Sequence, residues 1–194
     1  DFMSHVIENY FDREQAFVPD ALNEGLLRAV IKYTPIALKQ PSSYEARAQL
    51  MWASTLALNG LGSTGKTFAW SCHYIEHELS AFYDITHGAG LAVLTPKWMR
   101  HILSEDTVDK FCDYAVNVWG LERGNDKFTL ANQGIDATEA FFKSIGLPST
   151  LAEFGIDNTH FELMAKNAVK IGGLRNAYVP LSEKDVVTIL QMSL

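Results

Sequence analysis

The chain has 194 residues, of which 47% are hydrophobic and 20% are charged, and its formal net charge is −7. This length and composition are typical of one globular domain with its own core. The acidic balance argues against binding to nucleic acid or to an anionic membrane, because both need clustered Lys and Arg. No apolar run approaches the roughly 18 residues that cross a bilayer. The only two cysteines, Cys72 and Cys112, form no disulfide framework, so we expect a cytoplasmic protein.

The spacing of apolar residues predicts helices along the whole chain. These residues recur mostly at intervals of three and four, and alternating β-branched runs are scarce. In chain order, the expected helices cover about residues 1–11, 20–40, 44–58, 67–83, 88–103, 106–119, a segment ending at 144, 158–170, and a last helix that opens at Ser182. The sequence therefore predicts one all-α domain over residues 1–194, a bundle of about eight or nine helices.

Three helix boundaries and one kink have local signals. Asp20 is a candidate N-cap for the second helix, and Pro35 is expected to kink it. Gly120 is expected to end the sixth helix. Ser182 is expected to cap the last helix with support from Asp185, three residues on.

The chain begins at Asp1, in the middle of a helical pattern and without an initiator Met. We therefore expect a piece of a longer protein, whose missing part lies upstream.

Acidic and histidine side chains recur at spacings that suit a metal site. Asp1 and His5 are four residues apart, as are His73 and His77, so each pair shares one face of a helix. His87 follows in an expected turn. The carboxylate of Asp1 and the imidazoles of His5, His73 and His87 would suit a divalent transition metal such as iron or zinc.

A glycine-rich loop suggests a different function. Residues 60–67 match the P-loop pattern G-x-x-x-x-G-K-[ST], which would make the chain a nucleotide-binding protein. That pattern requires a β-strand directly before the loop, whereas residues 48–58 read as a helix by composition. A helix-to-helix connection with glycines at its corners explains the loop without a ligand.

The segment from His73 to His77 also matches H-x-x-E-H, the inverted zinc-protease motif, with Glu76 as general base. This interpretation leaves Asp1, His5 and His87 unexplained.

Several stretches together resemble a known family. Residues 1–10, 51–60, 73–88, 91–96 and 141–148 are similar to the C-terminal helical domain of the iron-containing, or group III, alcohol dehydrogenases, in their butanol dehydrogenase-like branch. The most specific of these is residues 73–88, with three histidines at the family's spacing. The resemblance covers nearly the whole chain and implies the C-terminal domain of a dehydroquinate synthase-like two-domain fold.

The resemblance implies that Asp1, His5, His73 and His87 hold one divalent metal, Fe²⁺ or Zn²⁺. The metal would act as a Lewis acid on an alcohol or aldehyde oxygen while hydride passes between the substrate and NADP(H) or NAD(H). His77 is not one of the family's ligands, and we expect it to face the nicotinamide and help to relay the proton.

The same resemblance implies an upstream nicotinamide-binding domain, a small alcohol or aldehyde substrate, and a homodimer as one possible assembly. Glu8, one turn after His5, would orient a ligand. We expect the isolated chain to lack full activity, because that domain is absent and because a terminal amino group lies beside Asp1. A helical module that binds metal without catalysis is the remaining alternative.

Overall fold

The structure is a computed structural model that describes residues 1–194, and it is entirely helical. Its α-helices are α1 (Phe2–Tyr10), α2 (Phe17–Lys39), α3 (Tyr44–Leu58), α4 (Cys72–Tyr83), α5 (His87–Ile102), α6 (Val108–Trp119), α7 (Lys127–Ser144), α8 (Phe161–Ile171) and α9 (Glu183–Met192). Two short 3-10 helices, Leu61–Ser63 and Leu151–Phe154, complete the structure. Nine α-helices without a strand confirm the predicted all-α class.

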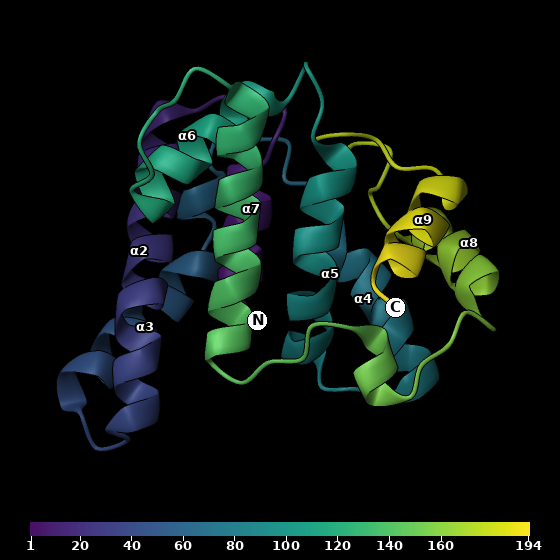
Figure 1. The fold of residues 1–194 in the computed structure, drawn as a ribbon, viewed down its shortest axis with the longest axis horizontal. Coiled ribbons are helices and arrows are strands. Elements are labelled where there is room, and N and C mark those ends of the chain that lie inside the picture. Colours follow the sequence, from purple (N-terminus) through teal and green to yellow (C-terminus); the bar gives the residue numbers. More distant parts are fainter.

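The helices pack mostly as neighbouring pairs (Figure 1). Helix α2 packs on α3, α4 on α5, α6 on α7, and α8 on α9. Helix α1 contacts α2, α3 and α5, and every residue from Met3 to Tyr10 is buried. A polar side chain on α1 therefore has to find its partners inside the protein.

Several predicted boundaries are confirmed. The third helix covers Tyr44–Leu58 as predicted. Helix α6 ends at Gly120, which has a φ of +69°. The side chains of Ser182 and Asp185 form the predicted capping box at the start of α9.

The predicted starts of α2 and α4 are wrong, and so is the turn assigned to His87, which is the first residue of α5. Helix α2 begins at Phe17, so Asp20 lies in its first turn and its carboxylate binds lysines instead of capping. Helix α4 begins at Cys72, about five residues later than predicted. The carboxylate of Asp12 accepts hydrogen bonds from the backbone N–H groups of Thr67 and Phe68, which holds the chain before α4 out of a helix.

Pro35 lies inside α2, and the helix continues past it to Lys39.

The core is one cluster of 42 buried residues that draws on every α-helix. Helices α6 and α7 cross closely at Gly134, where an added Cβ would lie 2.9 Å from the Cβ of Ala115.

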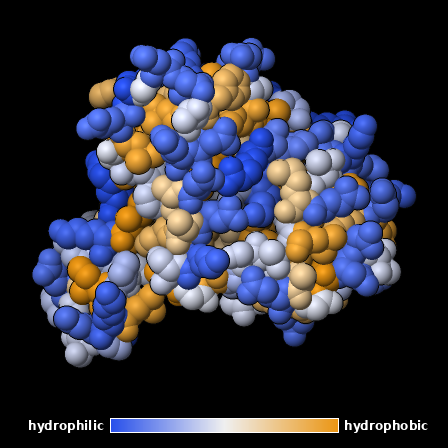
Figure 2. Space-filling model, in the orientation of Figure 1, coloured by the Kyte–Doolittle hydropathy of each residue, from blue (hydrophilic) through white to orange (hydrophobic).

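Some large apolar side chains remain on the surface. Helix α3, which with the end of α2 projects at the lower left of Figure 1, exposes Tyr44, Met51, Trp52 and Leu58. Figure 2 shows hydrophobic surface on this projecting part and elsewhere, mixed with hydrophilic surface. No helix is both long enough and apolar enough to cross a membrane.

Candidate metal centre

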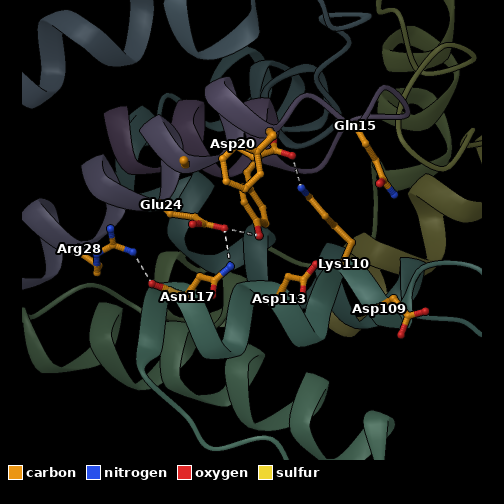
Figure 3. Close-up of a pocket in the computed structure, with 11 residues that line it drawn as sticks. Gln15, Asp20, Glu24, Arg28, Asp109, Lys110, Asp113 and Asn117 are labelled. Atoms are coloured by element: carbon orange, nitrogen blue, oxygen red, sulfur yellow. Dashed lines mark hydrogen bonds and ion pairs between the residues drawn. The ribbon is translucent and has the colours of Figure 1, made fainter.

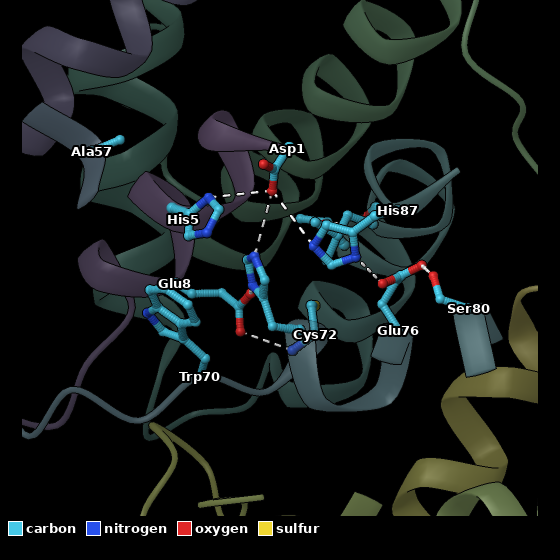
Figure 4. A network of polar contacts seen from close by, with 12 residues as sticks. Asp1, His5, Glu8, Ala57, Trp70, Cys72, Glu76, Ser80 and His87 are labelled. Carbon is cyan, nitrogen blue, oxygen red and sulfur yellow. Dashed lines mark hydrogen bonds and ion pairs between the residues drawn. The ribbon is translucent and has the colours of Figure 1, made fainter. Parts of the chain in front are cut away.

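The candidate site lies where the start of α1 meets the starts of α4 and α5 (Figure 4). Asp1 precedes α1 directly, and His5 lies one turn into that helix. The Oδ1 atom of Asp1 is 3.4 Å from Nδ1 of His5, 3.7 Å from Nε2 of His73 and 3.6 Å from Nε2 of His87. The structure thus brings the four residues expected as ligands to one place, although they come from three helices.

Glu8 fixes the orientation of His73. Its Oε1 atom lies 2.5 Å from Nδ1 of His73, and its Oε2 atom accepts hydrogen bonds from the backbone N–H groups of Ser71 and Cys72. Glu8, Cys72 and His73 are all at most 2% exposed. A carboxylate on Nδ1 makes that nitrogen the donor, so Nε2 keeps its lone pair and faces Asp1.

Glu76 has the same relation to His87. Its Oε2 atom contacts Nδ1 of His87, and its Oε1 atom accepts a hydrogen bond of 2.7 Å from the hydroxyl of Ser80. Glu76 is fully buried, and His87 is about one-third exposed. Both histidines therefore present Nε2 to the same carboxylate oxygen.

The spacing at Asp1 suits ligands of one metal better than hydrogen bonds. Hydrogen bonds between nitrogen and oxygen span about 2.7–3.2 Å. Two ligand atoms at about 2.1 Å from a tetrahedral Zn²⁺ lie about 3.4 Å apart. The observed 3.4–3.7 Å lies above the hydrogen-bond range and begins at the separation expected for two ligands of one metal.

Two buried nitrogen atoms in the site, Nδ1 of His5 and Nε2 of His73, make no hydrogen bond. Buried polar atoms without a partner are rare in native proteins, and an ion is one recognised explanation for them. One ligand atom each from Asp1, His73 and His87 lies within 4.8 Å of the others. His5 stands beside this trio, next to Asp1, and is not part of it. Burial, followed by the charge of His73, lowers the pKa of His5 to about 4, which keeps its imidazole neutral near pH 7.

His77 lies at the edge of the site and is exposed. Its ring centroid is 5.5 Å from that of His87 and 6.3 Å from that of His73. Burial, with the nearby charges of those two histidines, lowers its pKa. His77 therefore lies beside two of the candidate ligands, and its part in proton relay stays a prediction.

Two other residues that form the site have no clear sequence signal. The ring of Trp70 lies 4.8 Å from that of His5 and 4.5 Å from that of His73, and its Nε1 donates to Asn9. Glu76 is conspicuous in the sequence only within the protease motif. The structure contradicts a general-base role for Glu76, because its carboxylate is buried and bound to His87 and Ser80.

The glycine-rich loop lacks the structural setting of a P-loop. A helix, α3, precedes it, and Leu61–Ser63 forms a 3-10 helix. The Lys66 side chain is only 1% exposed, and its ammonium donates to the backbone carbonyl of Asn9 and to Asp20. A lysine held in this way is not available to a phosphate, so the nucleotide-binding interpretation is wrong.

A cavity of about 900 Å³ lies between α2 and α6, away from the candidate metal centre (Figure 3). Its polar groups mostly bind one another. Glu24 accepts hydrogen bonds from the hydroxyl of Tyr10 and from Asn117, and Lys110 donates to Asp20 at 2.7 Å. The only residue of α1 that lines this cavity is Tyr10, at the opposite end of that helix from Asp1.

The fold and the site define a helical domain with a candidate divalent-metal centre of one carboxylate and several imidazoles. The model of the Fe-containing alcohol dehydrogenase family, C-terminal, matches residues 1–194, and the chain belongs to that family.

Relatives and solved structures agree with this assignment. The chain is 51% identical, over its full length, to NADH-dependent butanol dehydrogenase A of Clostridium acetobutylicum, and it covers 50% of that protein. It is 34% identical to an NADPH-dependent aldehyde reductase of Escherichia coli, over 89% of this chain and 44% of that protein. The crystal structure of NADH-dependent butanol dehydrogenase A from Thermotoga maritima superposes on the whole chain with a TM-score of 0.90 and 34% identity, and the match covers 50% of that structure. The chain thus spans about half the length of the curated relatives it matches.

Proposed function

We propose that this chain supplies the metal-binding half of a nicotinamide-dependent alcohol dehydrogenase or aldehyde reductase. The observation that carries the proposal is the convergence of three imidazoles on one oxygen of Asp1 at 3.4–3.7 Å. Relatives named as butanol dehydrogenases and an aldehyde reductase support the reaction class.

Asp1, His5, His73 and His87 would hold the metal, Fe²⁺ or Zn²⁺. Their donor set of one carboxylate and three imidazoles suits either ion. When bound, the metal would supply Lewis-acid polarisation of an alcohol or carbonyl oxygen. Trp70, packed on two of the ligand rings, would limit the access of water from its side.

His77 is proposed as the residue that moves the proton. It is exposed, it lies beside two ligand rings, and its lowered pKa favours a neutral imidazole that can accept a proton.

The rest of the active site would come from an upstream nicotinamide-binding half, which would carry NAD(H) or NADP(H). The exposed apolar side chains of Trp52, Leu58 and Phe68 are candidates for contact with that half. A small alcohol or aldehyde is the proposed substrate, and a homodimer is the proposed assembly. Two buried, unpaired cysteines fit a cytoplasmic location.

The test uses the full-length protein that contains this chain. His73→Ala and His87→Ala are expected to lose bound iron or zinc by elemental analysis. Their butyraldehyde reduction is expected to fall by about a thousandfold or more, since a Lewis acid supplies several kcal/mol. His77→Ala is expected to keep the metal and lose turnover.

His160→Ala is the matched control. His160 is exposed at the start of α8 and stacks on Phe82, away from the ligands, so this variant should match the wild type in metal content and activity. Retained turnover in both ligand variants would overturn the proposal. Bound metal without turnover on any alcohol or aldehyde would favour the non-catalytic module.

A further inference from the structure

We propose that Glu8 and Glu76 are positioning residues that preset the metal site by fixing the tautomers of His73 and His87. This inference rests on the proposed metal site and adds two residues that act through its ligands. Neither glutamate points at Asp1; each contacts the Nδ1 atom of one histidine.

Glu8 links two of the helices that carry ligands. It lies on α1 with His5, and its spacing from His5 and from Asp1, the residue before the helix, places all three on one face. Helix α4 has no side-chain cap of its own at Ser71, and the Glu8 carboxylate accepts the first backbone N–H groups of that helix in its place. The same carboxylate therefore sets both the start of α4 and the ring orientation of His73.

Glu76 links α4 to α5 in a site shaped to hold its carboxylate. An added Cβ on Gly90 would lie 2.6 Å from Oε1 and 2.8 Å from Cγ of Glu76. Ser80 binds Oε1, which leaves Oε2 for His87. Glycine at position 90 is what allows α5 to approach so closely.

A glutamine at position 8 could not accept hydrogen bonds from every group that the Glu8 carboxylate binds. The backbone N–H groups of Ser71 and Cys72 need an acceptor, and so does the Nδ1–H group of His73. A glutamine side chain offers one oxygen and one NH₂ group. If the NH₂ group faces the backbone, donors oppose donors. If it faces His73, Nδ1 must become the acceptor, and the proton moves to Nε2, where it blocks the metal.

The same reasoning applies to Glu76 and His87. A glutamine oxygen could satisfy either Ser80 or His87, but the NH₂ group would face the other. The serine hydroxyl can rotate and accept, so we expect a smaller effect from Glu76→Gln than from Glu8→Gln.

The experiment measures Zn²⁺ affinity by chelator competition in the full-length protein. Removal of a residue that hydrogen-bonds to a metal ligand typically lowers metal affinity by about 10- to 100-fold. We expect a loss in this range for Glu8→Gln, and a loss nearer its lower end for Glu76→Gln. Gly90→Ala, which displaces Glu76 without changing its chemistry, should also weaken binding.

Glu78→Gln is the matched control, because Glu78 is a buried glutamate on the same helix whose partner is Asn167 and not a histidine. It should bind Zn²⁺ within about twofold of the wild type, since it touches no ligand. Nitrogen-15 spectra of the metal-free histidines give a readout that a general loss of stability would not move. Glu8→Gln should shift His73 alone to the Nε2–H tautomer, and Glu76→Gln should shift His87 alone and only in part, because Ser80 can accept from the glutamine NH₂ group.

Wild-type affinity in both glutamine variants, with unchanged tautomers, would overturn this inference and leave the metal site standing. Absence of Zn²⁺ binding in the wild type would overturn the metal site and this inference together. Should Glu8→Gln fail to fold, Glu76→Gln and Gly90→Ala still decide the role of the second glutamate, and unchanged affinity in both would refute it.

Discussion

Asp20 is shared by two nearly buried lysines, and its replacement by asparagine should destabilise the chain strongly. Its carboxylate binds the ammonium groups of Lys66 and Lys110, and the three side chains are 13%, 1% and 10% exposed, respectively. Removal of one partner from a buried ion pair costs about 3–5 kcal/mol, because it leaves buried charge without compensation. In Asp20→Asn two ammonium groups lose their shared partner at once.

The size of the loss can be compared with that of Lys66→Met. This variant removes both contacts of the Lys66 ammonium, the one with Asp20 and the one with the carbonyl of Asn9, but it leaves Asp20 paired with Lys110 at 2.7 Å. We expect a cost of about 1.5–3 kcal/mol, the range for one hydrogen bond to a charged group, because no buried charge is left without a partner. For a chain of this size, about 3–5 kcal/mol corresponds to a fall of roughly 6–20 °C in Tm.

Urea unfolding followed by circular dichroism measures both free energies of unfolding. Asp113→Asn is the control, because it removes an exposed pair with Arg123 and should cost less than about 1 kcal/mol. Equal losses in Asp20→Asn and Lys66→Met would refute the reasoning, since they would mean that Asp20 has no special role in compensating two charges.

Two further predictions concern packing and pH. Gly134→Ala should destabilise the chain by about 1–3 kcal/mol, because its Cβ would lie 2.9 Å from Ala115 where α6 crosses α7; an unchanged Tm would contradict this. Burial lowers the pKa of Lys66 below 10.5, with Asp20 opposing the shift only in part. The unfolded chain therefore binds more protons than the folded chain between the lowered pKa and 10.5, so the stability of the wild type should rise with pH in that window relative to Lys66→Met. A difference in stability between the wild type and Lys66→Met that does not change with pH would contradict the lowered pKa of Lys66.

The helices that could be predicted well from sequence are those whose ends depend on neighbours in the chain. Ser182 and Asp185 cap α9 within three residues of each other, and Gly120 ends α6 through its own backbone conformation. The start of α4 could not be predicted, because it depends on Asp12 and Glu8, which lie more than 50 residues away in the sequence.

The candidate site, too, could be predicted from the sequence only in part. The pattern of Asp1 and His5 on one helix face, with His73 and His87 further on, indicated which residues to consider, and the structure brings them together. The same spacing placed His77 on the helix face of His73, but it did not show that His77 is exposed at the edge of the site while His73 is buried within it. Periodicity reports which residues share a helix face, but it does not report which helix packs against that face.

Glu76 illustrates the remaining difficulty. A glutamate between two histidines has the same sequence signal whether it acts as a base, faces solvent or orients a ring. Only the packing of α5 on α4, with Gly90 against its carboxylate, separates these roles.

The glycine-rich loop matches a nucleotide-binding pattern in sequence, but in the structure its lysine binds helix α1. One end of α1 carries Asp1 and His5, and Lys66 from the loop binds the carbonyl of Asn9 near the other end. The loop is also held to α2, because Asn23 donates to the carbonyl of Gly62 at 2.9 Å. The lysine that suggests a phosphate cradle therefore supports α1, and Gly62 ties the loop to α2. Substitution of Lys66 should therefore reach the metal centre through the position of α1.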